Sequence, residues 1–150
     1  MRFDEPPPEP LASAVGFLLS WNGRRTSAGF AEVLQEVNLS PPVFGVLTLI
    51  DSRPGLTQRE LVAGSLIDPS SMVAVLDQLE ADGLAERRIH ASDRRKRAVH
   101  LTAKGKRTLG KARQLAIDYA EELLAPLDED ERETLRLLLR KLARVDVPAE

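Results

Sequence analysis

The 150-residue chain contains no cysteine, which excludes disulfides, thiolate metal sites and thiol-based redox sensing. No apolar run approaches the roughly 20 residues needed to span a bilayer, so we expect no membrane association. The N-terminus has no apolar stretch after a basic start, and it therefore does not predict a secretory signal. We expect a cytoplasmic protein with one sizeable core.

Catalytic patterns are also missing from the sequence. It has no Ser-His-Asp spacing, no glycine-rich phosphate loop and no carboxylate–histidine cluster, so we predict no enzyme activity and no cofactor. The only histidines, His90 and His100, fall near a predicted hairpin and could lie close together. Two histidines without cysteine make a poor metal site, which leaves phosphate contact or simple exposure as their interpretations.

Positive charge is concentrated in one segment, although the formal net charge is only −2. Residues 87–107 hold nine Lys or Arg and one carboxylate, Asp93. Residues 84–113 hold eleven cations and two carboxylates, a local charge of +9, so the other 120 residues carry −11. Such blocks usually indicate a polyanionic partner, although many are only solvated surface.

Apolar spacing and capping residues predict a mainly α-helical protein with a small two-stranded β-wing. Helices are predicted over 11–37, 40–53, 57–67, 68–83, 103–125 and from 128 onward. Strands are predicted at 84–90 and 98–101, joined by an extended loop because 91–97 is too long for a two-residue turn. Residues 1–10, rich in proline and acid, are predicted to be a disordered lead-in. Two short helices followed by a hairpin form a winged helix-turn-helix pattern.

Two motifs resemble those of the MarR family of bacterial transcriptional regulators. They are "PGLTQREL" and "LEADGLAERR…DRRKRAVHLTAKG", within a similarity that spans residues 39–105. The resemblance implies a DNA-binding lobe at 39–102 and dimerisation helices at 11–38 and 103–147. It further implies a homodimer on a pseudo-palindromic double-stranded DNA operator, acting as a repressor. Many members also bind a small aromatic or anionic effector that weakens DNA binding.

For the wing, the resemblance makes Arg95 the tip residue that enters the DNA minor groove, where a narrow groove attracts arginine. Asp93 would orient Arg95 through an ion pair, which explains a carboxylate in a basic loop. Arg94, Lys96 and Arg97 would mainly contact phosphates. The alternative is a solvated basic loop.

The predicted recognition helix begins with Ser70 and Ser71, whose hydroxyls and free backbone N–H groups can bond phosphates or base edges. Many family members carry a Thr-Arg-like pair where this chain has Val73 and Ala74. This departure reduces hydrogen-bonded base readout and leaves thymine-methyl contacts, hydroxyl contacts and shape readout. Gln78 is a candidate for a base or backbone contact.

Further candidate DNA contacts flank this helix. Thr57 is a helix cap that can also meet phosphate, whereas Gln58 and Arg59 are either phosphate contacts or simply exposed. Lys104 starts the helix after the wing, where a cation opposes the helix dipole, so an external polyanion would explain it.

A candidate effector pocket combines aromatic stacking area with cations that can pair with a carboxylate. Its residues are Phe17, Trp21, Arg24, Arg25 and Phe44. The alternative is that these aromatics belong to the core and the arginines to the surface. A second possible function for the whole chain is a winged-helix module for protein–protein contacts, against which the arginine-rich wing argues.

Overall fold

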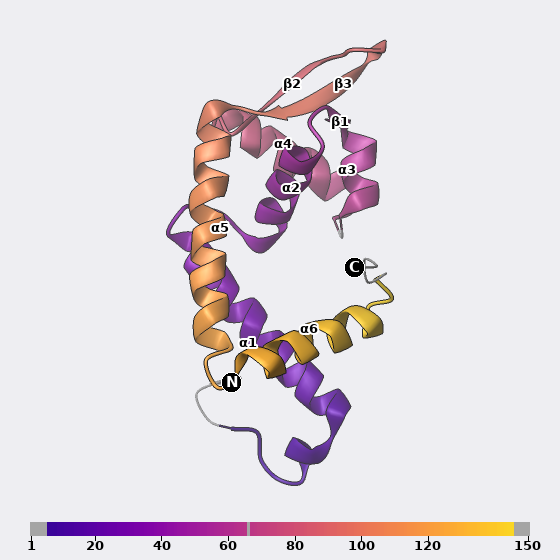
Figure 1. Ribbon diagram of the computed structural model, residues 1–150. Helices are drawn as coiled ribbons and strands as arrows, with labels where there is room; N and C mark the ends of the chain where they lie inside the picture. The colour runs from indigo at the N-terminus through magenta and orange to yellow at the C-terminus, as the bar shows by residue number, and fades with distance from the viewer. Residues whose placement is uncertain (1–5, 66, 146–150) are drawn as a thin grey trace. The chain divides into compact units, whose positions relative to one another are not determined.

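The computed structural model describes residues 6–65 and 67–145 (Figure 1). Its elements are η1 (Leu11–Ser13), α1 (Val15–Gln35), α2 (Pro41–Ser52), β1 (Leu56–Thr57), α3 (Gln58–Gly64), α4 (Pro69–Ala81), β2 (Ala85–His90), β3 (Asp93–Leu101), α5 (Ala103–Leu123) and α6 (Glu129–Leu142). The chain divides into two compact units, one ending at Ala116 and the other beginning at Ile117. The mainly α-helical class with a small β-wing is confirmed.

The ends of α4 follow from local sequence signals. The Asp68 carboxylate accepts hydrogen bonds from the backbone N–H groups of Ser70 and Ser71, both at 3.0 Å, and Pro69 occupies the first turn. At the other end Gly83 has a φ of +69°, a left-handed conformation that glycine adopts without steric cost. The sequence therefore starts and stops this helix at the predicted positions.

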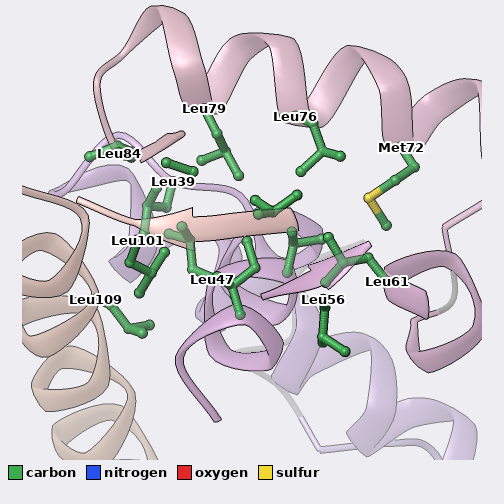
Figure 2. Close-up of a cluster of buried hydrophobic side chains, with 14 of the residues drawn as sticks. Leu39, Leu47, Leu56, Leu61, Met72, Leu76, Leu79, Leu84, Leu101 and Leu109 are labelled. Carbon is green, nitrogen blue, oxygen red and sulfur yellow. The ribbon is translucent and has the colours of Figure 1, made fainter. Parts of the chain in front are cut away.

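The core of the first unit lies between α4, α2 and the sheet. Met72, Leu76 and Leu79 of α4 recur at four- and three-residue steps, are buried, and point toward β3 (Figure 2). The other large side chains that are fully buried come from several elements: Leu34, Val46, Leu47, Ile50, Leu61, Val99 and Leu109. This packing fixes which face of α4 is turned inward, and hence which face is turned to solvent.

The start of α5 is built against the end of α4. The Thr102 hydroxyl accepts the Gly105 backbone N–H at 3.0 Å and donates to the Gly83 carbonyl at 2.6 Å. A Cβ atom on Gly105 would lie 1.9 Å from the carbonyl oxygen of Leu84. The Leu-Thr-x-x-Gly sequence therefore allows the backbone of α5 to approach the residue before β2.

Two predictions about the sheet need correction. The sheet has a third strand, in the order β1-β3-β2, with Leu56 opposite Val99. A two-residue strand is too short to show alternation, so β1 could not be predicted from the residue pattern. The predicted loop at 91–97 is wrong, because β3 already begins at Asp93 and only Ala91 and Ser92 form the turn.

Some helix boundaries also differ from the prediction. α3 ends at Gly64 instead of continuing to 67, and α5 ends at Leu123. The N-terminal helix begins at Val15, after the short 3₁₀ turn. Residues 1–5 of the expected lead-in, and 146–147 of the expected dimerisation segment, lie outside the described residues. Within the described part of the chain, no helix is both long and apolar enough to cross a membrane.

Candidate nucleic-acid interface

The helix-turn-helix begins with the capping box of α3. The Glu60 carboxylate accepts from the Thr57 hydroxyl at 2.7 Å and from the Thr57 backbone N–H at 2.8 Å, and these bonds lower the pKa of Glu60. Thr57 is thus the predicted cap. Beside it, Arg59 is exposed and Gln58 is half-buried.

Ser70 and Ser71 lie in the first turn of α4, as predicted, but their backbone N–H groups are not free. Both are bonded to Asp68, and the Ser70 hydroxyl lies 2.5 Å from the same carboxylate oxygen. Bonds from the Ser70 and Ser71 hydroxyls and their backbone hold the pKa of Asp68 well below its usual range. The expectation of free amides at this helix start is wrong, because Asp68 is itself the anion bound there.

The middle of α4 turns Val73, Ala74, Asp77 and Gln78 to solvent. The Gln78 amide donates to the Asp82 carboxylate at 2.9 Å. Val73 is 41% exposed, a large value for an apolar side chain in a helix whose other face is fully buried. The exposed face of α4 is therefore shaped by methyl groups and by polar side chains with partners inside the protein.

The basic residues of the wing form a bulge in β3, not a loop. His90 pairs with Asp93 and Ile89 pairs with Arg97, so Arg94, Arg95 and Lys96 have no partner residue in β2. Bulges re-aim side chains that a regular strand would alternate between the two faces of the sheet. Here the bulge gathers three consecutive cations beside the turn.

Asp93 acts mainly on the backbone of this bulge. Its Oδ1 accepts the Arg95 backbone N–H at 3.0 Å, and this bond is the main reason that the pKa of Asp93 is lowered. The Arg95 guanidinium is farther away, at 3.5 Å, and its side chain is 94% exposed. Lys96 Nζ lies 3.7 Å from the other carboxylate oxygen. Asp93 therefore fixes the chain from which Arg95 projects more than it fixes the guanidinium.

Arg95 does not lie at the tip of the wing, where it was predicted. The apex of the hairpin is Ala91 and Ser92, and Arg95 projects from the bulge that follows. Arg97, which ends the bulge, is exposed, and its guanidinium lies 3.5 Å from the Arg94 carbonyl.

Arg87 is a structural residue of this surface that the sequence did not single out. Its guanidinium lies 2.8 Å from the Asp77 carboxylate and also contacts Glu80, while its backbone N–H donates to Glu80 at 2.9 Å. The spacing of Asp77 and Glu80, three residues apart on the helix just before the strand, was the available signal. Arg87 thus ties β2 to α4, and the neighbouring Arg88 pairs with Glu86 of its own strand.

Lys104 at the start of α5 also has a partner inside the protein. Its ammonium donates to the Asp82 carbonyl at 2.7 Å, at the C-terminal end of α4. A cation there complements the negative end of that helix dipole, so local stability does explain Lys104. The remaining ammonium N–H groups can still meet an external phosphate.

The two histidines are separated along the hairpin. His90 borders the turn and contacts Ser92, whereas His100 lies opposite Glu86 and beside Gly55. The expectation that the pair could be close is therefore wrong. Across residues 6–65 and 67–145, no group of three or more metal-ligating side chains gathers.

The five candidate effector residues do not form one aromatic cluster. Phe17 stacks on Trp21 with ring centroids 5.9 Å apart, whereas Phe44 packs edge-to-face with Phe30 at 5.4 Å. Arg24 and Arg25 are exposed on α1. A hollow of about 570 Å³ in the same unit has other lining residues, among them Gln35, Ser40 and Gln78. The aromatic residues predicted to line one pocket therefore belong to two separate ring contacts.

Comparisons with known proteins agree with this geometry. Residues 37–96 match the model of the MarR family. The HTH-type transcriptional regulator BilQ of Clostridium symbiosum is 34% identical over 111 residues, covering 74% of this chain and 77% of BilQ. The solved transcriptional repressor CouR, bound to a 23-mer DNA duplex, is 33% identical with a TM-score of 0.81, covering 93% of this chain and 99% of that one. CouR from Rhodococcus jostii RHA1, bound to p-coumaroyl-CoA, has 26% identity and a TM-score of 0.77, covering 95% and 99%.

Proposed function

The chain belongs to the MarR family of transcriptional regulators, and we propose that it is a repressor that binds a pseudo-palindromic operator as a homodimer. The observation that carries the proposal is the bulge of Arg94, Arg95 and Lys96, held by Asp93 in a hairpin that Arg87 ties to α4. Three adjacent exposed cations on a positioned element suit a polyanion with a regular backbone.

In this proposal the wing supplies the minor-groove and phosphate contacts. Arg95 enters the minor groove, because its guanidinium is exposed, always charged and weakly hydrated. The other proposed phosphate contacts are cationic or polar side chains around the helix-turn-helix: Thr57, Gln58, Arg59, Arg94, Lys96, Arg97 and Lys104. These contacts set the register of the protein on DNA and its salt dependence.

The exposed face of α4 enters the major groove, as the second helix of a helix-turn-helix does. Ser70 and Ser71 face the DNA as hydrogen-bond acceptors beside the helix start. Gln78 has a second amide N–H, beyond the one given to Asp82, for the DNA backbone. The DNA-binding lobe is 39–102 in this proposal, and the flanking helices form the dimer.

Dimerisation is supported by apolar side chains that the second unit leaves exposed. They lie on α6: Leu135, Leu137, Leu138, Leu139 and Leu142, with exposed fractions from 37% to 66%. So many exposed leucines on one helix are typical of an interface. A two-fold dimer would present two recognition helices about 34–36 Å apart, one DNA turn.

A small aromatic anion is the effector that we propose releases the DNA. The stacked Phe17–Trp21 pair offers a ring surface, and Arg24 and Arg25 follow Trp21 on α1 at three- and four-residue steps. Thermal unfolding in the presence of aromatic carboxylates tests this, because a ligand that binds the folded protein raises its Tm. Trp21→Ala should abolish that rise.

A gel shift with DNA from the promoter region of the protein's own gene tests the function as a whole. We expect retardation that survives excess competitor of shuffled sequence. Equal competition by shuffled DNA would overturn the proposal. A complete lack of retardation would favour the protein-interaction module instead.

A further inference from the structure

The polar side chains on the solvent-facing side of α4 already have bonding partners within the protein. Ser70 and Ser71 bond to Asp68, Asp77 bonds to Arg87, and Gln78 bonds to Asp82. The serine hydroxyls can still accept and Gln78 keeps a second amide N–H, so hydrogen-bonded reading of base edges by this face is reduced but not abolished.

The helix also contains no lysine or arginine. Between 68 and 82 the charged residues are Asp68, Asp77, Glu80 and Asp82. A bidentate arginine on guanine is the commonest specific contact in the major groove, and this helix cannot make it. Carboxylates also repel phosphates, so the charges of α4 do not favour contact with the DNA backbone.

Val73 and Ala74 remain at the centre of this face. Val73 lies three residues after Ser70 and four before Asp77, and Ala74 lies four after Ser70 and three before Asp77. All four positions therefore share one side of the helix. Val73 is 41% exposed, and Ala74 is also exposed. Neither side chain is required by the core, which Met72, Leu76 and Leu79 fill from the opposite side.

We infer that Val73 and Ala74 read the 5-methyl groups of pyrimidines in each operator half-site, so that thymine and 5-methylcytosine are accepted where cytosine is not. The inference rests on the proposed function, since it assigns a base-reading role to α4 in the major groove. The 5-methyl group is the apolar feature that the major groove offers, and alanine-like side chains contact it. Burying one methyl group contributes about a fourfold gain in affinity.

The test uses the duplex that the full-length protein enriches from a random pool. Each half-site thymine is replaced in turn by deoxyuridine, which keeps base pairing and removes only the methyl group. At one or two positions per half-site we expect the Kd to rise about fourfold. Replacing that T·A pair by C·G should weaken binding further, and 5-methylcytosine at the same position should restore part of the loss.

Val73→Ala provides the matched protein variant, because alanine suits an exposed helix position and the fold should be kept. In this variant the deoxyuridine penalty should shrink at the position that Val73 contacts, whereas a position contacted by Ala74 should keep its penalty. Ile89→Ala, which shortens an exposed apolar side chain of the wing, should leave that penalty unchanged.

Failure of this inference can be distinguished from failure of the proposed function. If the unmodified duplex binds selectively and deoxyuridine has no effect at any position, or if Val73→Ala keeps the full penalty at every position, methyl reading is wrong and the proposed function stands. If the random pool yields no enriched duplex, the proposed function fails and the inference fails with it.

Discussion

The guanidinium of Arg87 in β2 lies 2.8 Å from the carboxylate of Asp77 in α4. With its contact to Glu80, this bond joins the wing to the helix proposed to enter the major groove. The Arg87 side chain is only 23% exposed whereas that of Asp77 is 62% exposed, so solvent screens the pair in part. The two elements that we propose contact DNA are thus joined to each other.

Arg87→Ala should destabilise the fold and weaken DNA binding together. It leaves two carboxylates without their cation, and because solvent reaches both of them we expect the free energy of unfolding to fall by about 1 kcal/mol. Urea denaturation measures this loss. Arg88→Ala is the control, since Arg88 pairs only with exposed Glu86, and it should change stability by less than about 0.5 kcal/mol. Equal losses in both variants would contradict the coupling role of Arg87.

Asp93 should be replaceable by asparagine but not by alanine. Asparagine keeps an oxygen for the Arg95 backbone N–H, and alanine removes it. We expect Asp93→Asn to keep most of the operator affinity and Asp93→Ala to lose part of it, measured by fluorescence anisotropy. If Asn fails like Ala, the negative charge of Asp93 matters more than the backbone bond.

The lowered pKa of Asp93 also predicts how the stability of the wing depends on pH. Folding lowers the pKa of Asp93 below its ordinary value of about 3.9. Its contribution to stability is therefore complete above that value and is lost as the pH falls toward the lowered pKa. Between pH 5.5 and 8, Asp93 should cause no change in the stability of the wing.

Arg95 and Lys96 should separate specific from general DNA binding. Arg95→Ala should weaken operator binding by about 1–3 kcal/mol, because a minor-groove contact is lost. Lys96→Ala should weaken operator and shuffled DNA alike and reduce the salt slope by about 1. Anisotropy titrations at several salt concentrations measure both effects. An altered base preference in Lys96→Ala would argue against a phosphate contact.

Gly105→Ala should destabilise the fold although it adds a single methyl group. The new Cβ would lie 1.9 Å from the Leu84 carbonyl oxygen, and the backbone would have to shift, at a cost of about 1–3 kcal/mol. Gly110→Ala on the same helix meets no atom within 4 Å and should stabilise the protein slightly. Thermal unfolding of both variants checks this, and a neutral Gly105→Ala would show that α5 can move away from Leu84.

The sequence predicted the helices well because their signals are local. Capping by Asp68 and Thr102, and the stop at Gly83, lie within a few residues of the helices that they define. The bulge at Arg94–Lys96 was missed, since strand register depends on pairing with a distant segment. The roles of Arg87 and Lys104 were also missed, because their partners are 7–22 residues away.

The candidate site, like the fold, was predicted only in part. The cationic wing and the carboxylate of Asp93 could be picked out from composition and spacing. The occupied amides of Ser70 and Ser71 were signalled as well but not recognised, because Asp68 stands at the N-cap and a carboxylate there accepts such N–H groups. The Phe17–Trp21 and Phe30–Phe44 contacts could not be predicted, because the sequence alone does not show which rings lie close together.

Selection of bound DNA from a random pool by the full-length protein tests the central claim most directly. We expect enrichment of a pseudo-palindromic site whose half-sites are centred about 34–36 Å apart, one turn of the double helix. The same measurement reports sequence selectivity and the two-fold symmetry of a homodimer. A pool that stays random after repeated rounds, or an enriched site without two-fold symmetry, would contradict the account.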